Sequence, residues 1–372
     1  MDTQDIKKYI WTKMSPLYFQ RIRPVTHYRY LFFLSQNYSF PVLRPLQEVI
    51  LQRGDEVKWF LYGNEIDYTL LYANEIQIND IESIIEYNPH AVFVPGNVVP
   101  SFIPGVKVEI FHGLPSKKTK KNGQLYHYII REMFDLYCTH GPQSTKIFEQ
   151  LSHKYKNFSV IETGWSKLDP LFSKHDSIKK RKQKVIFFAS TFSPRFSKAR
   201  ILYPYIKRMI HSHNYHWYIT LHPKMPQDVV SLYQTLKSEK VTLLDATQVI
   251  ESFSNADIML CDTSSIMYEF LTQNKPVITF QTQEDEEIFI NIKDINVLEQ
   301  TIVHTLKNSD TYHKTIKQFV KDIHPYTDGK SSQRILDATV SMINGNNLPK
   351  KQKPWNIIRN FKLRLKFKYW KF

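Results

Sequence analysis

Short apolar runs recur along the first half of the chain, separated by polar stretches that contain turn-forming residues. They are "YRYLFFLS" (28–35), "VKWFLYG" (57–63), "AVFVPG" (91–96), "KVEIFHG" (107–113) and "DLYCTHG" (135–141). Apolar runs of this length, bounded by turn signals, are typical of buried strands. Residues 41–54 have helical character and close on Gly54. Because strand and helix patterns alternate, we expect a parallel α/β sheet.

The alternation restarts after "SKHDSIKKRKQK" (173–184), a charged segment that we interpret as a linker. Five further strands are predicted at 185–191, 216–224, 241–245, 256–262 and 276–280, with helices at 197–212, 226–237, 247–254 and 264–272. We therefore expect two Rossmann-like domains, 1–172 and 185–345, with parallel sheets facing a central cleft, followed by a separate tail, 346–372. Ligands of such sheets bind outside the carboxyl ends of the strands.

Composition narrows the class of partner. The 372 residues are 42% hydrophobic and carry a formal net charge of +15, which favours an anionic partner: nucleic acid, an acidic membrane surface or a phosphorylated substrate. The two cysteines, Cys138 and Cys261, give neither a disulfide framework nor metal-ligand spacing, as is typical of a reducing cytoplasm. The sequence shows no signal peptide and no run of ~18 apolar residues. We expect a cytoplasmic protein with, at most, peripheral membrane contact.

The last residues, "KKQKPWNIIRNFKLRLKFKYWKF" (350–372), contain nine Lys or Arg and no acid. Basic and apolar residues alternate from Phe361 to Tyr369, and as a helix Ile357, Phe361, Leu365 and Tyr369 would form a partial stripe. We expect this tail to attach the protein to the inner, anionic face of the cell membrane. A solvated tail, or an edge strand packed on the protein, remains open, and nucleic-acid contact is a lesser rival.

Candidate chemistry gathers at four predicted strand ends: His112-Gly113, Ser190-Thr191, His222-Pro223 and Asp262–Ser265. A histidine at a strand end can act as a general base, although a core histidine would look the same in the sequence. Gly113 would allow a sharp turn and close approach of a ligand. Lys117 and Lys118 follow, either as solvated charges or as point charges for a phosphate.

The stretch "CDTSSIMYEF" (261–270) passes from a strand end directly into a helix. Capping needs one of its four small polar residues, so Ser264 and Ser265 are candidates to bind an anion at the first turn. His222 could donate to the same phosphoryl oxygens, and Glu269 could accept from ribose hydroxyls. The chain has no Walker A or G-x-G-x-x-G loop, so any nucleotide would be held by helix N-termini and side chains.

Five stretches resemble successive motifs of the CDP-glycerol glycerophosphotransferase family: "IFHGLPSKK", "TGWSKLD", "ITLHP", "ADIMLCDTSSIMYEFLTQNKPVITF" and "YTDGKSSQRIL". The resemblance runs from about residue 107 to 340 and is loose before that. It implies a GT-B architecture with an acceptor-binding N-terminal domain and a nucleotide-binding C-terminal domain. In this sequence it would make His112 the base and Asp262 the residue that orders its turn. His222, Ser264 and Ser265 would hold the donor diphosphate. Further candidates to bind the donor phosphates in this sequence are Asp262, Thr263, Ser190 and Thr191.

The sequence departs from the family at two places. Thr263 stands where the family usually has Tyr, and Ser190-Thr191 stands where it often has Pro-Thr. Neither departure removes a candidate catalytic group, but both bear on the identity of the donor.

The expected activity is transfer of a polyol phosphate, glycerol phosphate above all, from a CDP-activated donor to a hydroxyl of a lipid-linked or polysaccharide acceptor in bacterial cell-surface polymer synthesis. No metal or other cofactor is expected. A GT-B glycosyltransferase that uses a nucleotide sugar is the first alternative, and a basic RNA- or polyanion-binding protein is the second. No RNA-binding signature is present, so no nucleic-acid partner is expected. The acceptor and the oligomeric state are not fixed by the sequence.

Overall fold

The computed structural model describes residues 27–115, 123, 125–173, 183–245, 248–282 and 287–371. The chain divides into two compact units. Unit 1 comprises residues 1–112, 128–167 and 330–372, and unit 2 comprises residues 113–127 and 168–329. Lys117, Lys118 and most of the predicted linker lie outside the described residues.

Unit 1 is built on a sheet of six parallel strands in the order β2-β1-β3-β4-β5-β6. The strands are β1 (Arg29–Leu34), β2 (Glu56–Leu61), β3 (Ala91–Val94), β4 (Val106–Glu109), β5 (Leu136–Thr139) and β6 (Ser159–Glu162). The five strands expected from the sequence are confirmed. Strand β6 was not expected, because its four residues are only half-buried and form no continuous apolar run.

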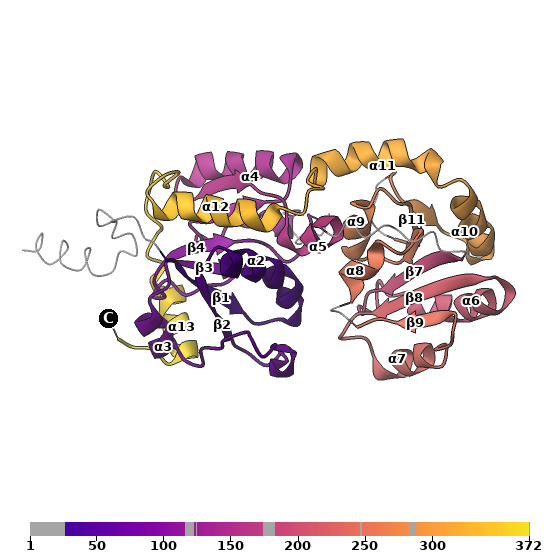
Figure 1. The fold of residues 1–372 in the computed structure, drawn as a ribbon, viewed down its shortest axis with the longest axis horizontal. Helices are drawn as coiled ribbons and strands as arrows, with labels where there is room; N and C mark the ends of the chain where they lie inside the picture. Colours follow the sequence, from indigo (N-terminus) through magenta and orange to yellow (C-terminus); the bar gives the residue numbers. More distant parts are fainter. Residues whose placement is uncertain are drawn as a thin grey trace, which may run out of the picture. The chain divides into compact units, whose positions relative to one another are not determined.

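The helices of unit 1 are α2 (Phe40–Gln52), α3 (Ile81–Tyr87), α4 (Pro142–Tyr155), α12 (Ser331–Ile343) and α13 (Ile357–Phe367), with short 3-10 turns at η1 (Asn37–Ser39), η2 (Tyr68–Leu70), η3 (Tyr126–Tyr128) and η4 (Ser166–Leu168). Helices α2 and α12 pack side by side (Figure 1), and α12 also contacts β4 and β5. A hydrophobic core of unit 1 forms around Leu31, Phe33, Val92 and Val94, and it includes Leu363 of α13.

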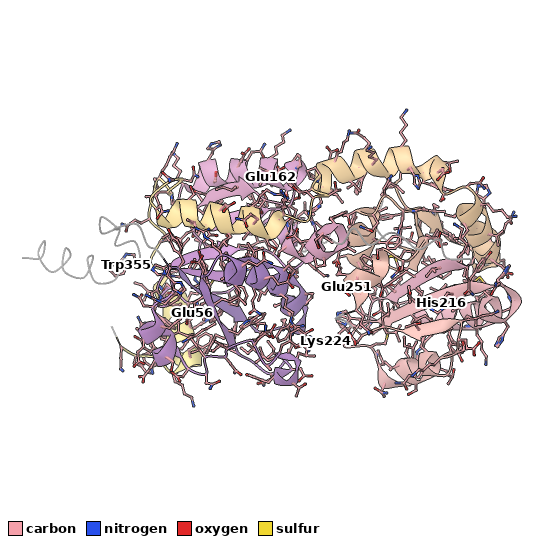
Figure 2. All side chains as sticks on the ribbon, viewed as in Figure 1. Glu56, Glu162, His216, Lys224, Glu251 and Trp355 are labelled. Atoms are coloured by element: carbon pink, nitrogen blue, oxygen red, sulfur yellow. The ribbon has the colours of Figure 1, made fainter. Side chains whose placement is uncertain are left out.

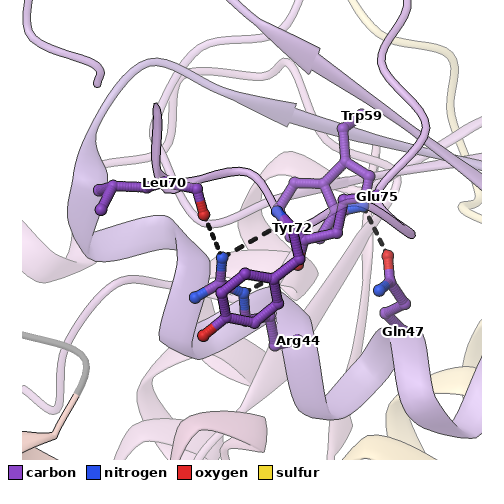
Figure 3. Close-up of polar contacts among 6 residues, drawn as sticks. All are labelled: Arg44, Gln47, Trp59, Leu70, Tyr72 and Glu75. Atoms are coloured by element: carbon purple, nitrogen blue, oxygen red, sulfur yellow. Dashed lines mark hydrogen bonds and ion pairs between the residues drawn. The ribbon is translucent and has the colours of Figure 1, made fainter. Parts of the chain in front are cut away.

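The long connection from β2 to α3 is held against α2 by a buried ion pair (Figure 3). Arg44 Nε lies 2.8 Å from Glu75 Oε1, and the Arg44 guanidinium stacks 3.5 Å from the centre of the Tyr72 ring. Trp59 Nε1 donates to Gln47 Oε1 at 2.6 Å. These contacts tie the connection to the same helix that covers the sheet, so the loop has a defined path.

Unit 2 repeats the design with strands in the order β12-β11-β10-β7-β8-β9, all parallel. They are β7 (Lys184–Ser190), β8 (Tyr215–Leu221), β9 (Val241–Leu243), β10 (Ile258–Cys261), β11 (Val277–Phe280) and β12 (Ile290–Ile292). The helices are α5 (Asp169–Ser173), α6 (Ala199–Ser212), α7 (Gln227–Gln234), α8 (Val249–Phe253), α9 (Ile266–Leu271), α10 (Leu298–Lys307) and α11 (Asp310–Ile323), with η5 (Ile295–Val297). The five expected strands are confirmed, and β12 is additional.

The strand orders define one topological switch point in each unit. In unit 1, β1 lies between β2 and β3, and in unit 2, β7 lies between β8 and β10. The connections on either side of such a strand leave in opposite directions, which opens a ligand crevice at the carboxyl ends of the strands. The residues after β1, β3, β7 and β10 are therefore the first places to look for a site.

The end of the chain differs from its expected layout. The second domain was expected to run to residue 345, whereas α12 buries Ile335 and Leu336 and packs on α2 of unit 1. The range 346–372 was expected to be a separate tail, whereas α13 within it is packed on unit 1. Within the described ranges, no helix combines the length and the apolar character needed to cross a bilayer.

Candidate active site

His112 lies three residues beyond the last residue of β4, at the carboxyl end of that strand, and is exposed. Its Nδ1 is 3.2 Å from the carbonyl oxygen of Pro95, which follows β3. The ring of Tyr38, in the connection after β1, lies 4.9 Å from the His112 ring. Three neighbouring strands thus contribute to this histidine's surroundings. Neither Tyr38 nor Pro95 was singled out from the sequence, because neither belongs to a recognisable motif, although both follow predicted strands.

The contact with Pro95 fixes the tautomer of His112. A carbonyl oxygen can only accept a hydrogen bond, so Nδ1 is the nitrogen that carries the proton. In the neutral ring, Nε2 is then the unprotonated nitrogen, which can accept a proton. This is the form that a general base requires.

The backbone takes an unusual conformation at Phe111, directly before the bend at His112 and Gly113. Phe111 has a φ of 57°, in the left-handed region that a bulky residue rarely occupies. Its buried ring packs 5.2 Å from Phe148, and its carbonyl accepts from Trp165 Nε1 at 3.3 Å. Gly113 has no positive φ, and no described atom lies within 4 Å of the position that a Cβ would take. Gly113 lies in a bend of the backbone, and the space beside it is open among the described residues.

Glu109 is a further ionisable group beside this site. It is the last residue of β4 and is buried. Burial raises its pKa well above the ordinary value, and the charge of Arg131 and the Phe111 N–H oppose the rise. Burial raises the pKa of Tyr38 to about 12, and the charge of Glu109 contributes to this rise. Glu109 was not singled out from the sequence because it lies inside an apolar run.

In unit 2, Asp262 joins the ends of β10 and β7. Its Oδ1 accepts from the Thr191 N–H at 2.9 Å, and its Oδ2 accepts from the Lys198 N–H at 3.0 Å and from the Ser190 hydroxyl. The carboxyl is fully buried, and burial raises its pKa although these hydrogen bonds oppose the rise. Asp262 therefore positions the loop after β7 and the start of α6, rather than offering its charge to a ligand.

His222 extends strand β8 by one residue, since its N–H donates to the Ser190 carbonyl at 3.2 Å. Its Nδ1 lies 3.0 Å from the Lys224 N–H and must accept this hydrogen bond. In the neutral ring the proton is then on Nε2, which is a donor. The Phe192 ring lies 4.3 Å from the His222 ring. His222 is thus held in the tautomer opposite to that of His112. Phe192 was missed because a lone aromatic residue after a strand carries no distinctive pattern.

Helix α9 begins directly after this cluster. Ser264 and Ser265 are half-buried, and the side chain of Ser265, the N-cap residue, makes no capping hydrogen bond in the described structure. The Thr263 hydroxyl lies 3.3 Å from that of Thr282, beyond β11. Glu269 is only 3% exposed. Three neighbouring strands of unit 2, β8, β7 and β10, thus carry Ser190, Thr191, His222 and Asp262–Ser265 at their carboxyl ends, whereas His112 and Gly113 follow β4.

Two parallel-sheet α/β units with a strand-end crevice in each define a GT-B-like protein, and this confirms the expected fold class. The chain belongs to the CDP-glycerol glycerophosphotransferase family: the family described as CDP-Glycerol:Poly(glycerophosphate) glycerophosphotransferase matches residues 105–341. The resemblance inferred from the sequence motifs is confirmed.

Individual relatives are distant. The chain is 23% identical over 225 residues to the teichoic acid glycerol-phosphate primase of Bacillus subtilis (strain 168), a match that covers 56% of this chain and 58% of the primase. The structure of the wall teichoic acid polymerase TagF is similar with a TM-score of 0.60 at 14% identity, covering 85% of this chain and 88% of that one. A UDP-N-acetylglucosamine 2-epimerase structure from Listeria monocytogenes has a TM-score of 0.60 at 15% identity, covering 87% and 99%. At these identities the structural likeness establishes the fold.

Proposed function

We propose that this protein transfers glycerol phosphate from CDP-glycerol to a hydroxyl of a growing or priming cell-surface polymer. The observation that carries the proposal is the pair of histidines in opposite tautomers. His112 Nε2 is arranged to accept a proton, and His222 Nε2 is arranged to donate a hydrogen bond. A transfer between a hydroxyl and a diphosphate needs one group of each kind. Family membership supplies the reaction class.

In the proposed reaction the acceptor hydroxyl gives its proton to His112 Nε2 as its oxygen attacks the β-phosphorus. The new oxygen–phosphorus bond forms while the bond from the β-phosphorus to the bridging oxygen breaks. CMP leaves with the electron pair of that bond. His222 Nε2–H donates to a phosphoryl oxygen and stabilises the charge that develops there. Positioning and charge stabilisation are the main tasks of the protein in such a transfer.

The donor phosphates are assigned to the crevice between β7 and β10. We place around the phosphates the Ser264 and Ser265 hydroxyls and the loop that starts at Ser190-Thr191, with Thr263 beside them. Because Asp262 holds that loop through two backbone N–H groups, the donor would meet a preorganised surface. Glu269 is kept as the candidate partner of the ribose, Gly113 as the place of close approach, and Lys117 and Lys118 as candidate phosphate contacts.

The acceptor is proposed to be lipid-linked or a polysaccharide, and unit 1 is proposed to bind it and unit 2 the nucleotide donor. We further propose that the basic range 346–372 attaches the protein to the anionic, cytoplasmic face of the membrane. Its nine Lys or Arg support this attachment, since each basic residue near an anionic surface contributes about 1 kcal/mol.

The test is turnover of CDP-glycerol with a lipid-linked acceptor, followed by mass spectrometry of both products. Release of CMP with a product heavier by glycerol phosphate is expected. Release of a nucleoside diphosphate, with sugar transfer from a nucleotide sugar, would instead establish the alternative glycosyltransferase.

The two histidines are separated by three matched variants. His112→Ala should lose transfer yet retain donor binding, whereas His222→Ala should lose donor hydrolysis as well as transfer. His216→Ala is the control, because His216 lies near the amino end of the same strand β8 (Figure 2) and bonds to Thr242 at 2.9 Å. Wild-type turnover of His112→Ala would refute its assignment as the base. A His222→Ala enzyme that binds CDP-glycerol normally and fails only with the acceptor would move His222 to the acceptor side.

A further inference from the structure

Helix α13 is fixed to unit 1 by one face. Leu363 is 8% exposed and belongs to the core around β1 and β3. Phe367 packs 5.2 Å from Tyr62 and 5.9 Å from Phe33, ring centre to ring centre. Arg359 donates to the carbonyls of residues 131 and 132, and Asn360 accepts from the Ser101 hydroxyl at 2.9 Å. The helix is therefore a docked element of the domain and not a free tail.

The opposite face of α13 is apolar and open. We call it the outward stripe. Its members are Ile357, Ile358, Phe361 and Leu365, whose side chains are 72%, 74%, 57% and 59% exposed. At about 100° of rotation per residue, these side chains centre on the direction opposite Leu363. A docked helix already has its apolar face in the core, so a second apolar face directed at water indicates a further partner.

Cationic and aromatic residues surround the outward stripe. Lys362 and Arg364 lie on the two sides of the helix, each about 100° from Leu363, and so border the outward stripe. Trp355 precedes the helix, at the margin of unit 1 in Figure 2, and Trp370 follows it; they are 48% and 45% exposed. The Trp370 ring lies 5.6 Å from that of Phe361. Apolar side chains between cations, with tryptophans at both ends, are typical of a helix that lies in a membrane interface.

A cavity of about 640 Å³ lies along the same segment. Its lining combines apolar and aromatic side chains, among them Phe102, Trp355 and Phe361, with the cationic Lys353, Arg359 and Arg364. Acidic Glu132 and Asp135 also line it, and Asp135 is paired with Lys353 at 2.6 Å. The recess thus adds a mixed apolar and cationic surface beside the outward stripe, which suits an amphiphile with an anionic headgroup.

We propose that α13 is a membrane-docking helix whose outward stripe enters the boundary between headgroups and acyl chains of an anionic phospholipid bilayer. This deepens the proposed membrane attachment and rests on it. The segment that binds the membrane is then a helix packed on unit 1 and not a separate tail. Insertion depends on the four side chains of the outward stripe, and the cations beside the stripe favour anionic lipid. Since the inward face is held by the core, docking would fix the orientation of unit 1 against the membrane.

The experiment is flotation of the full-length protein with vesicles of phosphatidylcholine and phosphatidylglycerol. The double variant Ile358→Ser/Leu365→Ser removes two stripe residues without changing charge, and we expect at least a tenfold weaker partition. The matched control is Ile201→Ser/Leu51→Ser, which makes the same two substitutions at helix positions that are each 47% exposed. It should float like the wild type. Brominated lipid should quench the wild-type tryptophan fluorescence, and Trp355→Phe/Trp370→Phe should remove most of that quenching.

Several outcomes would overturn the proposal. One is that the stripe variant floats as well as the wild type. Another is that the control variant loses as much flotation as the stripe variant. A third is that the wild type binds pure phosphatidylcholine vesicles as well as vesicles that contain phosphatidylglycerol. If the stripe variant changed the mass of the protein in solution and not its flotation, the stripe would be a contact between two copies. Circular dichroism confirms that each variant is folded. Flotation needs neither donor nor acceptor, so its failure leaves the proposed reaction untouched, and a transfer-dead His112→Ala protein should still float.

Discussion

Replacing Asp262 with alanine should loosen the loop after β7 and weaken donor binding together. The carboxylate is buried and accepts from two backbone N–H groups, those of Thr191 and Lys198, and from the Ser190 hydroxyl. Alanine leaves all three donors without this acceptor. Asparagine keeps one carbonyl oxygen for the Thr191 N–H but presents an NH₂ group towards the Lys198 N–H and the Ser190 hydroxyl. The hydroxyl can turn to accept from the NH₂ group, whereas the hydrogen bond from Lys198 is lost.

The expected change in the free energy of unfolding follows from two opposing contributions. Three hydrogen bonds to a charged acceptor, at ~1.5 kcal/mol each, favour the native residue. The raised pKa of Asp262 shows that burial disfavours its carboxylate, and removing the charge returns part of that cost. We therefore expect Asp262→Ala to lower the free energy of unfolding by about 3 kcal/mol and Asp262→Asn by about 1–2 kcal/mol.

The assay combines urea unfolding with hydrogen–deuterium exchange and calorimetric titration of CDP-glycerol. Exchange should rise selectively in residues 190–198, and donor affinity should fall at least tenfold in both variants. Asp257→Ala is the control, because Asp257 makes a similar contact at the other end of β7, accepting from the Val185 N–H at 2.8 Å. The reasoning is refuted if asparagine costs as much stability as alanine, or if donor affinity falls equally in the control.

Two further predictions use other residues. Ser264→Ala and Ser265→Ala should each weaken CDP-glycerol binding roughly 10- to 100-fold by calorimetry, because each removes a donor to a charged phosphate; unchanged dissociation constants in both would exclude this turn from the donor site. Lys107 is buried, and its pKa is lowered to about 7, chiefly by that burial. A lysine whose folded pKa lies below its unfolded value destabilises the fold while protonated, so the free energy of unfolding should rise by about 2 kcal/mol from pH 7 to pH 9. Lys107→Met should abolish that rise in urea titrations, and an unchanged slope would contradict the assignment.

Much of the fold follows from local pattern. Ten strands were predicted because each contains a short apolar run in the sequence, and buried parallel strands read as continuous hydrophobic stretches. Strands β6 and β12 lie at the edges of their sheets, where one side is open and the apolar signal is weak. The domain boundary near residue 345 was not predictable from local pattern. The apolar face of α12 is the same whichever sheet it covers, and only packing on α2 decides its partner.

The candidate site was predictable where chemistry follows a strand directly. His112, His222 and Asp262 each leave an apolar run, and the structure places each of them at such a strand end. Their partners were not predictable in this way. Tyr38, Phe192 and the Pro95 carbonyl act through proximity created by strand order, and the tautomers depend on backbone contacts that no sequence pattern records.

The chain leaves unit 1 at residue 167 and returns to it at residue 330, after unit 2 has been traversed. During synthesis on the ribosome the six strands of unit 1 emerge long before α12 and α13, which cover part of their surface. Loop closure over this distance slows the pairing of α12 with α2. Until residue 330 has been made, the first sheet lacks the cover of α12 and α13. That incomplete chain is where a chaperone would find exposed apolar surface, and where a premature stop before residue 330 would leave α2 without its partner helix.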